Sequence, residues 1–254
     1  MPRIYLINVG ANVGHQREAR SPIFPDGSFE YVSFPDEDRT THYPASARPF
    51  VRPRIKTTHL DPDWPNLSYG DFCKNRRAKA LTNVQPEDIL LFWGLLWRTP
   101  SRQSSIWMSE DRGWYLMGAM RVKIVLSSGE SLESLPTNDR KRLRQNDHVR
   151  GDRVEGREHV KVFLADRKYS RKFDRAVDLQ IYADDSLLIA IVKTSDGKNI
   201  MWYERPRWNS VTRACRAILD LSDPTHAKRA RILRDAIRAK NGDYDLLKDL
   251  PLPK

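Results

Sequence analysis

The feature that most constrains the fold is an uninterrupted apolar run at residues 89–96, which reads ILLFWGLL. A helix that crosses a bilayer needs about 20 apolar residues, so this run is too short, and we expect no membrane partner. Its length fits a strand that is buried on both faces. Residues 113–125 read GWYLMGAMRVKIV, and the internal Gly118 is typical of a β-bulge. These stretches predict two central strands, the second with a bulge.

The first half of the chain contains shorter β-rich segments and a long irregular one. Residues 3–9 (RIYLINV) and 28–34 (SFEYVSF) predict two short strands. Residues 35–65 are rich in Pro, Asp, Thr and Arg without periodicity, which predicts an irregular, exposed loop of the kind that often carries function. Ser68 and Asp71 have the spacing of a capping box, so we expect a helix over residues 69–82.

The second half of the chain places further strands before helices. We expect a short helix near residues 132–143 and strands at residues 159–164, 179–182 and 187–193. From residue 211 onward apolar residues recur at helical spacing, which predicts two terminal helices separated at residues 222–224. This order indicates an α+β fold with a mixed, mostly antiparallel sheet and a C-terminal pair of helices. We expect a main domain at residues 1–209 and a basic helical extension at residues 210–254, packed on it.

Charge points to a polyanionic partner. The chain has 44 Lys and Arg against 33 Asp and Glu, and residues 139–175 alone hold thirteen basic and seven acidic residues. Such an excess attracts nucleic acid or nucleotides, although interspersed acidic residues fit a merely solvated face equally well. The candidate phosphate ligands are Arg76, Arg77, Arg150 and Arg171.

Several classes of protein are excluded. Seven Trp, nine Tyr and eight Phe supply enough apolar surface for a core, so the chain is not a disordered one. Cys73 and Cys215 are too few for a disulfide framework, and the N-terminus lacks the features of a secretory signal, so we expect a cytoplasmic protein. The sequence has no G-x-S-x-G, Walker or G-x-G-x-x-G motif, and we assign no covalent mechanism.

The most concentrated polar signal is the segment HLDPDW, followed by YGD. In an extended segment, His59, Asp61 and Asp63 could face the same way, and their groups suit proton transfer or a divalent metal. We take these three and Asp71 as candidate catalytic residues. The alternative is that Asp61 and Asp63 form side-chain turns with their own backbone and that His59 is a hydrogen-bonded loop residue.

A glycine-bearing loop, NVGANVGH, follows the first predicted strand. Its glycines let backbone amides approach a phosphate or base, and Asn8, Asn12 and His15 supply directional hydrogen bonds. A plain connection between a strand and a turn is the alternative. Trp97 and Trp107 lie in or next to a polar loop, and each could stack on a base for roughly 1–3 kcal/mol. We count Asn8, Asn12, Trp97 and Trp107 as candidate substrate-binding residues.

Six segments carry a resemblance to a known family. They read IYLINVGAN, ARSPIFPDGSFEYVSFP, HLDPDWPNLSYGDFC, VQPEDILLFWGLLW, NDHVR and YSRKFDRAVDL. Over residues 3–179 the chain resembles the nucleotide modification associated domain 3 family, which implies a setting of DNA-base or nucleotide modification and no defined reaction. Glu87-Asp88 departs from the usual Gly-Asp of that family. The resemblance adds to the candidate substrate-binding residues Ser21, Asp26, Asn146, His148 and Ser170.

The middle of the chain is also similar to a PUA-type barrel, with a strand that starts at Asp88 beside a strand with a central Gly118. This analogy implies a barrel core and a pocket for a single nucleotide. We favour an enzyme that modifies a nucleobase in an aromatic, acid-lined pocket. The alternatives are a non-catalytic reader of modified nucleic acid and a nuclease-like or accessory subunit. The reaction, the base, any cofactor or metal and the oligomeric state stay open at this point.

Overall fold

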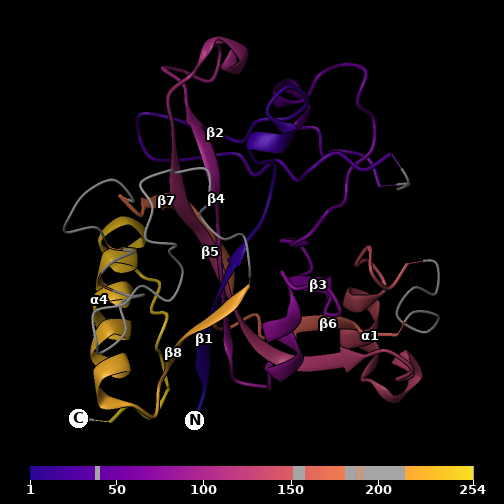
Figure 1. The fold of residues 1–254 in the computed structure, drawn as a ribbon, viewed down its shortest axis with the longest axis vertical. Coiled ribbons are helices and arrows are strands. Elements are labelled where there is room, and N and C mark those ends of the chain that lie inside the picture. The colour runs from indigo at the N-terminus through magenta and orange to yellow at the C-terminus, as the bar shows by residue number, and fades with distance from the viewer. Residues whose placement is uncertain (38–40, 151–157, 181–186, 188–189, 191–214, 254) are drawn as a thin grey trace.

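The computed structural model describes residues 1–37, 41–150, 158–180, 187, 190 and 215–253. Within these residues the core is an eight-stranded mixed sheet with the order β3-β6-β5-β4-β1-β8, in which β2 also pairs with β4 and β7 with β5 (Figure 1). The strands are β1 (Arg3–Asn8), β2 (Pro22–Ile23), β3 (Ser68–Phe72), β4 (Ile89–Arg98), β5 (Arg112–Ser127), β6 (Val160–Ala165), β7 (Arg171–Asp178) and β8 (Arg216–Asp220).

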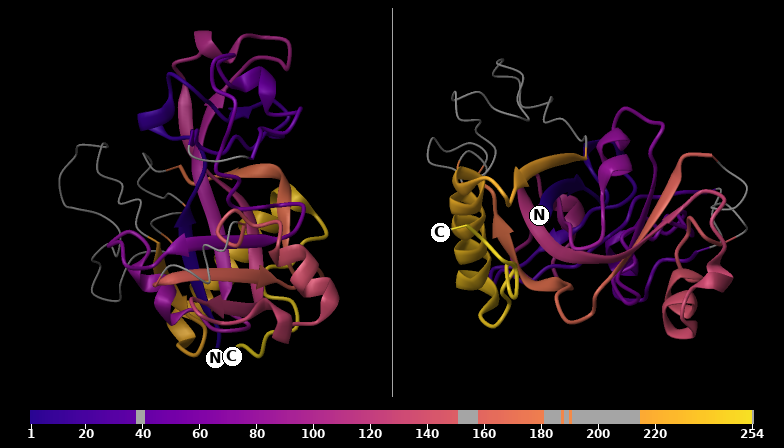
Figure 2. Two further views of the ribbon diagram at one scale, coloured as in Figure 1. Left: turned by 90° about the vertical axis from the view of Figure 1, so that its right-hand side faces the viewer. Right: turned by 90° about the horizontal axis from the view of Figure 1, so that it is seen from below.

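Helices are few in the described part of the chain. The α-helices are α1 (Thr137–Leu143) and α4 (Pro224–Asn241). Short 3-10 helices lie at Val13–His15, Arg48–Phe50, Lys79–Asn83, Ile106–Met108 and Leu132–Ser134. In the views of Figure 1 and Figure 2, α4 and α1 lie on opposite sides of the curved sheet. The α+β class is confirmed, but the sheet is open and not closed into a barrel, so the barrel alternative is wrong.

The two predicted central strands are confirmed as β4 and β5. They pair antiparallel along most of β4, and the register shifts by one residue where Phe92 faces Gly118 and Trp93 faces Leu116. The predicted bulge therefore lies beside Gly118. The absence of a side chain at Gly118 also makes room for Trp64, because a Cβ atom there would lie 2.3 Å from the indole ring.

The predicted helix over residues 69–82 is wrong. Residues 68–72 form β3, which pairs antiparallel with β6, and only Lys79–Asn83 form a 3-10 helix. Pairing with β6 and burial of Tyr69, which is 2% exposed, outweigh a helix propensity that is only a fraction of a kcal/mol per residue. The predicted short helix near residues 132–143 is confirmed by Leu132–Ser134 and α1.

The N-terminal expectations are met in part. Residues 3–8 form β1, as predicted, and β1 runs parallel to β4. Residues 28–34 form no strand and make one isolated bridge, from Phe29 to Ile23. The described part of 35–65 is irregular, as predicted, but it is not generally exposed. Its side chains Tyr43, Phe50 and Ile55 are buried because they pack in the main hydrophobic core.

The C-terminal segment contains one of the two predicted helices. Residues 216–220 form β8, which pairs antiparallel with β1, so the first predicted helix is wrong here, because edge pairing overrides the helical spacing. The second is α4, which begins after Asp223, whose carboxylate accepts the backbone N–H groups of Thr225 and His226. The predicted strands at 179–182 and 187–193 fall largely outside the described residues. The preceding strand, β7, was not predicted.

Candidate functional site

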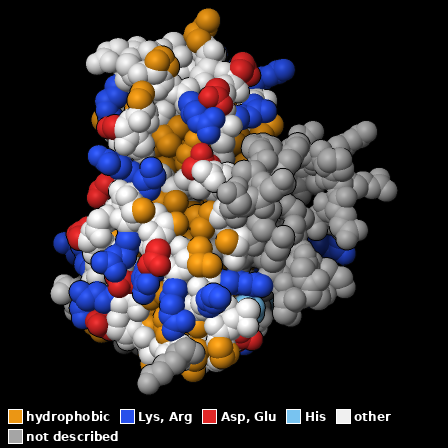
Figure 3. Space-filling view, turned by 90° about the vertical axis from the view of Figure 1, so that its left-hand side faces the viewer, with side chains coloured by type: hydrophobic (Ala, Val, Ile, Leu, Met, Phe, Trp, Pro, Cys, Tyr) orange, Lys and Arg blue, Asp and Glu red, His pale blue; other side chains and the backbone are white. Residues whose placement is uncertain are grey.

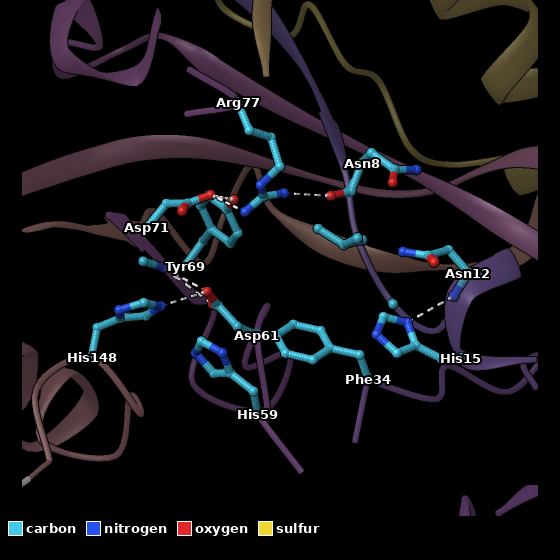
Figure 4. A pocket seen from close by; sticks show the side chains of 13 residues that line it. Asn8, Asn12, His15, Phe34, His59, Asp61, Tyr69, Asp71, Arg77 and His148 are labelled. Atoms are coloured by element: carbon cyan, nitrogen blue, oxygen red, sulfur yellow. Dashed lines mark hydrogen bonds and ion pairs between the residues drawn. The ribbon is translucent and has the colours of Figure 1, made fainter. Parts of the chain in front are cut away.

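A cavity of about 260 Å³ lies at the carboxyl end of β1, where the chain leaves the sheet (Figure 4). Ligands of open sheets commonly bind beyond the carboxyl ends of parallel strands. The wall is formed by the end of β1 and the loop after it, by Phe34 and the proline-rich loop (residues 35–65), by β3 and Arg77 beyond it, and by the turn after α1. The lining residues are Asn8, Val9, Gly10, Asn12, His15, Phe34, His59, Asp61, Tyr69, Gly70, Asp71, Arg77 and His148.

Asp61 lies on the wall of the cavity with only 6% of its surface exposed. Its two carboxylate oxygens accept the backbone N–H of Gly70, at 3.1 and 3.2 Å, and Oδ2 lies 3.3 Å from Nε2 of His148. Burial raises the pKa of Asp61 to about 6, although the hydrogen bond and charge of His148 act in the opposite direction. The carboxyl group therefore titrates unusually close to neutral pH.

Two imidazoles accompany this carboxylate. The ring centroids of His59 and His148 are 4.6 Å apart, and one donor atom from each of His59, Asp61 and His148 lies within 4.8 Å of the other two. Phe34 packs edge-on against His59, with ring centroids 5.1 Å apart, and stacks on His15 at its other side, as Figure 4 shows. Two imidazoles and a carboxylate can exchange protons or ligate a transition metal.

Hydrogen bonds from the segment NDH, residues 146–148, hold His148 and the segment from His59 to Asp61 in position. Asn146 accepts the backbone N–H of His148 at 2.9 Å and donates its side-chain amide to Ser68 Oγ at 3.0 Å. Asp147 accepts the backbone N–H of Leu60, the residue between His59 and Asp61, at 2.7 Å. Asn146 is fully buried, so it positions His148 and does not itself reach the cavity.

Asp71 forms a second buried charge group on the cavity wall. Oδ2 accepts the hydroxyl of Tyr69 at 2.7 Å and Nη2 of Arg77 at 2.5 Å, and Oδ1 accepts the backbone N–H of Phe72. Burial by itself would lower the pKa of Arg77, but the charges of Tyr69 and Asp71 outweigh this effect. The pKa of Arg77 is therefore raised above its ordinary value, and the guanidinium stays charged. Asp71 is therefore a partner that orients Arg77, whose side chain is 45% exposed.

The loop after β1 contributes the amide side chains predicted from sequence. Asn8 donates weakly to the Trp93 carbonyl at 3.4 Å, and Asn12 Oδ1 accepts the N–H of Gly14 at 3.0 Å. Gly10 has φ +79°, a left-handed conformation that favours glycine, and a Cβ there would lie 3.1 Å from Tyr31.

Several candidate residues lie away from the cavity. Asp63 accepts the backbone and side-chain N–H groups of Asn66, which is the side-chain turn held open as the alternative. Ser21 exchanges hydrogen bonds with the backbone of Val32. Asp26 accepts from Ser28, and Ser170 Oγ accepts the N–H of Arg121. Each of these side chains is therefore engaged in contacts within the protein, away from the cavity.

The candidate tryptophans Trp97 and Trp107 also lie outside the cavity. None of the described residues that line the cavity is a tryptophan. Trp97 is fully buried on β4, and Trp107 stacks under Arg52, whose guanidinium carbon lies 3.9 Å from the ring centroid. The expected indole wall is therefore replaced by Phe34, Tyr69 and His59, because hydrophobic burial takes the large rings of Trp97 and Trp93 into the core.

The candidate arginines have separate environments. Arg77 lines the cavity, whereas Arg76 is exposed outside it. Arg150 donates to Gln145 Oε1 at 2.6 Å, and Arg171 donates to the Asn241 carbonyl and to Asp243 at the end of α4. Arg150 and Arg171 therefore make contacts within the protein.

Sequence reasoning missed Phe34, Tyr69 and Gly70 as parts of the wall. The available signal was Gly70 within the motif YGD, because a glycine inside a strand often marks a place where another group approaches the backbone closely. A Cβ at Gly70 would lie 2.5 Å from Cδ2 of His148.

Replacing Asp61 with Asn is expected to stabilise the protein against unfolding near neutral pH. The comparison is made after treatment with a chelator, so that no metal ion bound to the carboxylate affects the result. The pKa of the carboxyl group is about 6 when folded and 3.8 ordinarily, so its contribution to stability is complete below about pH 4 and is lost as the pH rises through 6. Urea unfolding should therefore show D61N more stable than wild type by about 2–3 kcal/mol at about pH 8. The difference should vanish at about pH 4, and a less stable variant at about pH 8 would contradict the assignment.

Comparison with known proteins gives one match. The family described as nucleotide modification associated domain 3 matches residues 3–230. No curated protein and no solved structure matches the chain.

Among the residues that the structure describes, no helix combines the length and apolar character needed to traverse a lipid bilayer.

Proposed function

Since the chain belongs to the nucleotide modification associated domain 3 family, we propose that it is an enzyme that modifies a nucleobase bound in the cavity beside β1. The base belongs to a free nucleotide or to one nucleotide unit of a nucleic acid. The observation that carries the proposal is the convergence of Asp61, His59 and His148 on one cavity that also holds Phe34 and Arg77. The cytoplasmic location of the protein, expected from the sequence, stays a prediction.

The size of the cavity supports a ligand no larger than a single nucleotide unit. Its volume of about 260 Å³ is slightly below the roughly 300 Å³ at which pockets for drug-sized ligands begin. The partly exposed ring of Phe34 offers an apolar contact for a base, and the amides of Asn8 and Asn12 offer hydrogen bonds to a base edge.

Arg77 suits the phosphate of such a ligand. A guanidinium has five N–H donors, of which Arg77 directs one to Asp71 and one to the Asn8 carbonyl. The remaining donors can bind phosphate oxygens from the half-exposed side chain. Arg77 thus combines a fixed position with spare donors.

The buried ionisable cluster favours a catalyst over a reader. A reader needs only stacking and hydrogen-bond edges, whereas a catalyst needs titratable groups that converge on one substrate atom. Burying the Asp61 carboxyl group with its pKa raised to about 6 is costly for folding and is common at functional sites.

Basic surface supports a polyanionic partner for the molecule as a whole. Helix α4 carries six Lys and Arg residues and one Asp. Figure 3 displays the α4 side, where Lys and Arg side chains are spread over the described part of the face with fewer acidic groups among them. Such a surface raises the local concentration of nucleic acid.

Binding of 5′-mononucleotides tests the ligand class. We expect R77A to weaken the affinity for a mononucleotide, measured by calorimetry, by about 10-fold or more, because a charge-assisted hydrogen bond contributes about 1.5–3 kcal/mol. R76A is the matched control, since it removes the same charge from the neighbouring exposed position. Equal losses in both variants would show that general electrostatics, and not the cavity, binds the nucleotide.

Turnover separates the enzyme from the reader. Nucleotides and short oligonucleotides are incubated with the protein and a small-molecule cell extract, and their masses are measured. We expect a mass change with wild type and none with D61N, which should still bind. Binding without any mass change would favour the non-catalytic reader.

A further inference from the structure

We propose that His59, Asp61 and His148 bind a divalent first-row transition-metal ion whose remaining coordination positions face the cavity. The role of this ion in base modification rests on the proposed function, whereas its binding can be tested without any nucleotide. The three residues come from the proline-rich loop and from the turn after α1, so the fold brings the site together from distant parts of the sequence.

The geometry of the cluster fits a common ion. Zinc and similar ions bind nitrogen and carboxylate oxygen at about 2.0–2.2 Å. The 3.3 Å separation between His148 Nε2 and Asp61 Oδ2 corresponds to an angle of about 100° at an ion that is about 2.1 Å from both. The other separations within the cluster are at most 4.8 Å, and two ligand atoms that are each about 2.1 Å from one ion lie no more than about 4.2 Å apart, so binding of an ion would draw the side chains slightly closer together.

The ligand types select a class of ion. Imidazole nitrogen suits Fe(II), Co(II), Zn(II) and similar ions, whereas Mg(II) and Ca(II) prefer oxygen ligands. A set of two histidines and one carboxylate with open positions is the arrangement of mononuclear centres that bind a substrate or a small molecule directly. The nearby Asp71 is already paired with Arg77, so it does not enlarge the set with another carboxylate.

Contacts behind the three side chains hold them in place. The backbone N–H of Gly70 binds the Asp61 carboxylate, and Asn146 binds the backbone N–H of His148. The backbone N–H of His59 donates to the Phe34 carbonyl at 3.3 Å, and the carbonyl of His59 accepts the N–H of Asp61. Such outer contacts orient metal ligands and commonly change affinity by 10–100-fold when removed.

Calorimetric titration of the EDTA-treated protein, residues 1–254, with Co(II), Zn(II) and Mg(II) tests the proposal. We expect one equivalent of Co(II) or Zn(II) and binding of Mg(II) at least about 100-fold weaker. H148A and D61N should each weaken Co(II) binding by about 100-fold or more. H15A is the matched control, because His15 lines the same cavity outside the cluster, and its affinity should change by less than about 3-fold.

Circular dichroism verifies that each variant is folded. If a variant unfolds, the wild-type protein still decides the question: with Co(II) bound, the imidazole protons of two histidines should appear as strongly shifted NMR signals. Absence of Co(II) and Zn(II) binding, or equal weakening in H15A and H148A, would overturn the metal site. If the protein binds nucleotides but no metal, the metal site is wrong and the proposed nucleotide ligand stands. If it binds metal but no nucleotide, the metal site stands and the proposed function is wrong.

Discussion

A methyl group at Gly70 should disable the site. In G70A the new Cβ would lie 2.5 Å from Cδ2, 2.8 Å from Cγ and 2.9 Å from Cβ of His148. Because Gly70 is fixed by pairing between β3 and β6, and His148 by Asn146, neither backbone can yield easily. We expect His148 to leave Asp61, nucleotide and Co(II) affinity to fall by about 100-fold or more, and stability to fall by about 2–3 kcal/mol.

A double-mutant cycle isolates the cause. In an H148G background the clashing atoms are gone, so G70A should cost less than about 1 kcal/mol in urea unfolding. G14A is a control near the same cavity, because its added methyl would meet only Asn12 Oδ1, at 3.3 Å. If G70A costs the same with and without the His148 side chain, the close approach of the two residues is not what requires glycine.

Loss of glycine at the bulge of β5 should strongly destabilise the whole fold. In G118A the Cβ would lie 2.3 and 2.7 Å from two ring carbons of Trp64 and 2.8 Å from the backbone carbonyl of Arg171 on β7. Trp64 cannot retreat freely, since it packs edge-on against Phe92 with ring centroids 5.2 Å apart. We expect chemical denaturation to show a loss of about 3 kcal/mol.

Gly113 on the same strand provides the comparison. A Cβ there would lie 2.9 Å from a ring carbon of Tyr115, 3.2 Å from its hydroxyl and 3.3 Å from Nη2 of Arg98, so it would meet only the outer ends of side chains, whereas at Gly118 it also meets a backbone carbonyl. G113A should therefore cost about 1 kcal/mol or less. Replacing Trp64 with Leu should recover part of the loss in G118A. Equal costs for G118A and G113A would contradict the packing of Trp64 over the bulge.

Local sequence predicted those parts of the fold that local interactions dominate. The apolar run of β4 and the glycine of β5 have few alternatives, because an eight-residue apolar segment must be buried and a glycine favours a bulge. Helix α4 was predictable for the same reason: its apolar spacing agrees with a capping Asp223 and a proline at its first position. Residues 68–72 and 216–220 were misassigned because sheet partners far along the chain decide their conformation.

The candidate site shows the same division. The sequence alone identified His59, Asp61 and Asp63 as a polar group in a stiff loop, but it offered no means to tell the two carboxylates apart. The tertiary structure places Asp61 against Gly70 and His148, and it gives Asp63 to the turn at Asn66. Side-chain chemistry is thus determined by the sequence, whereas convergence on a cavity depends on strand pairing between distant segments, which residue spacing does not encode.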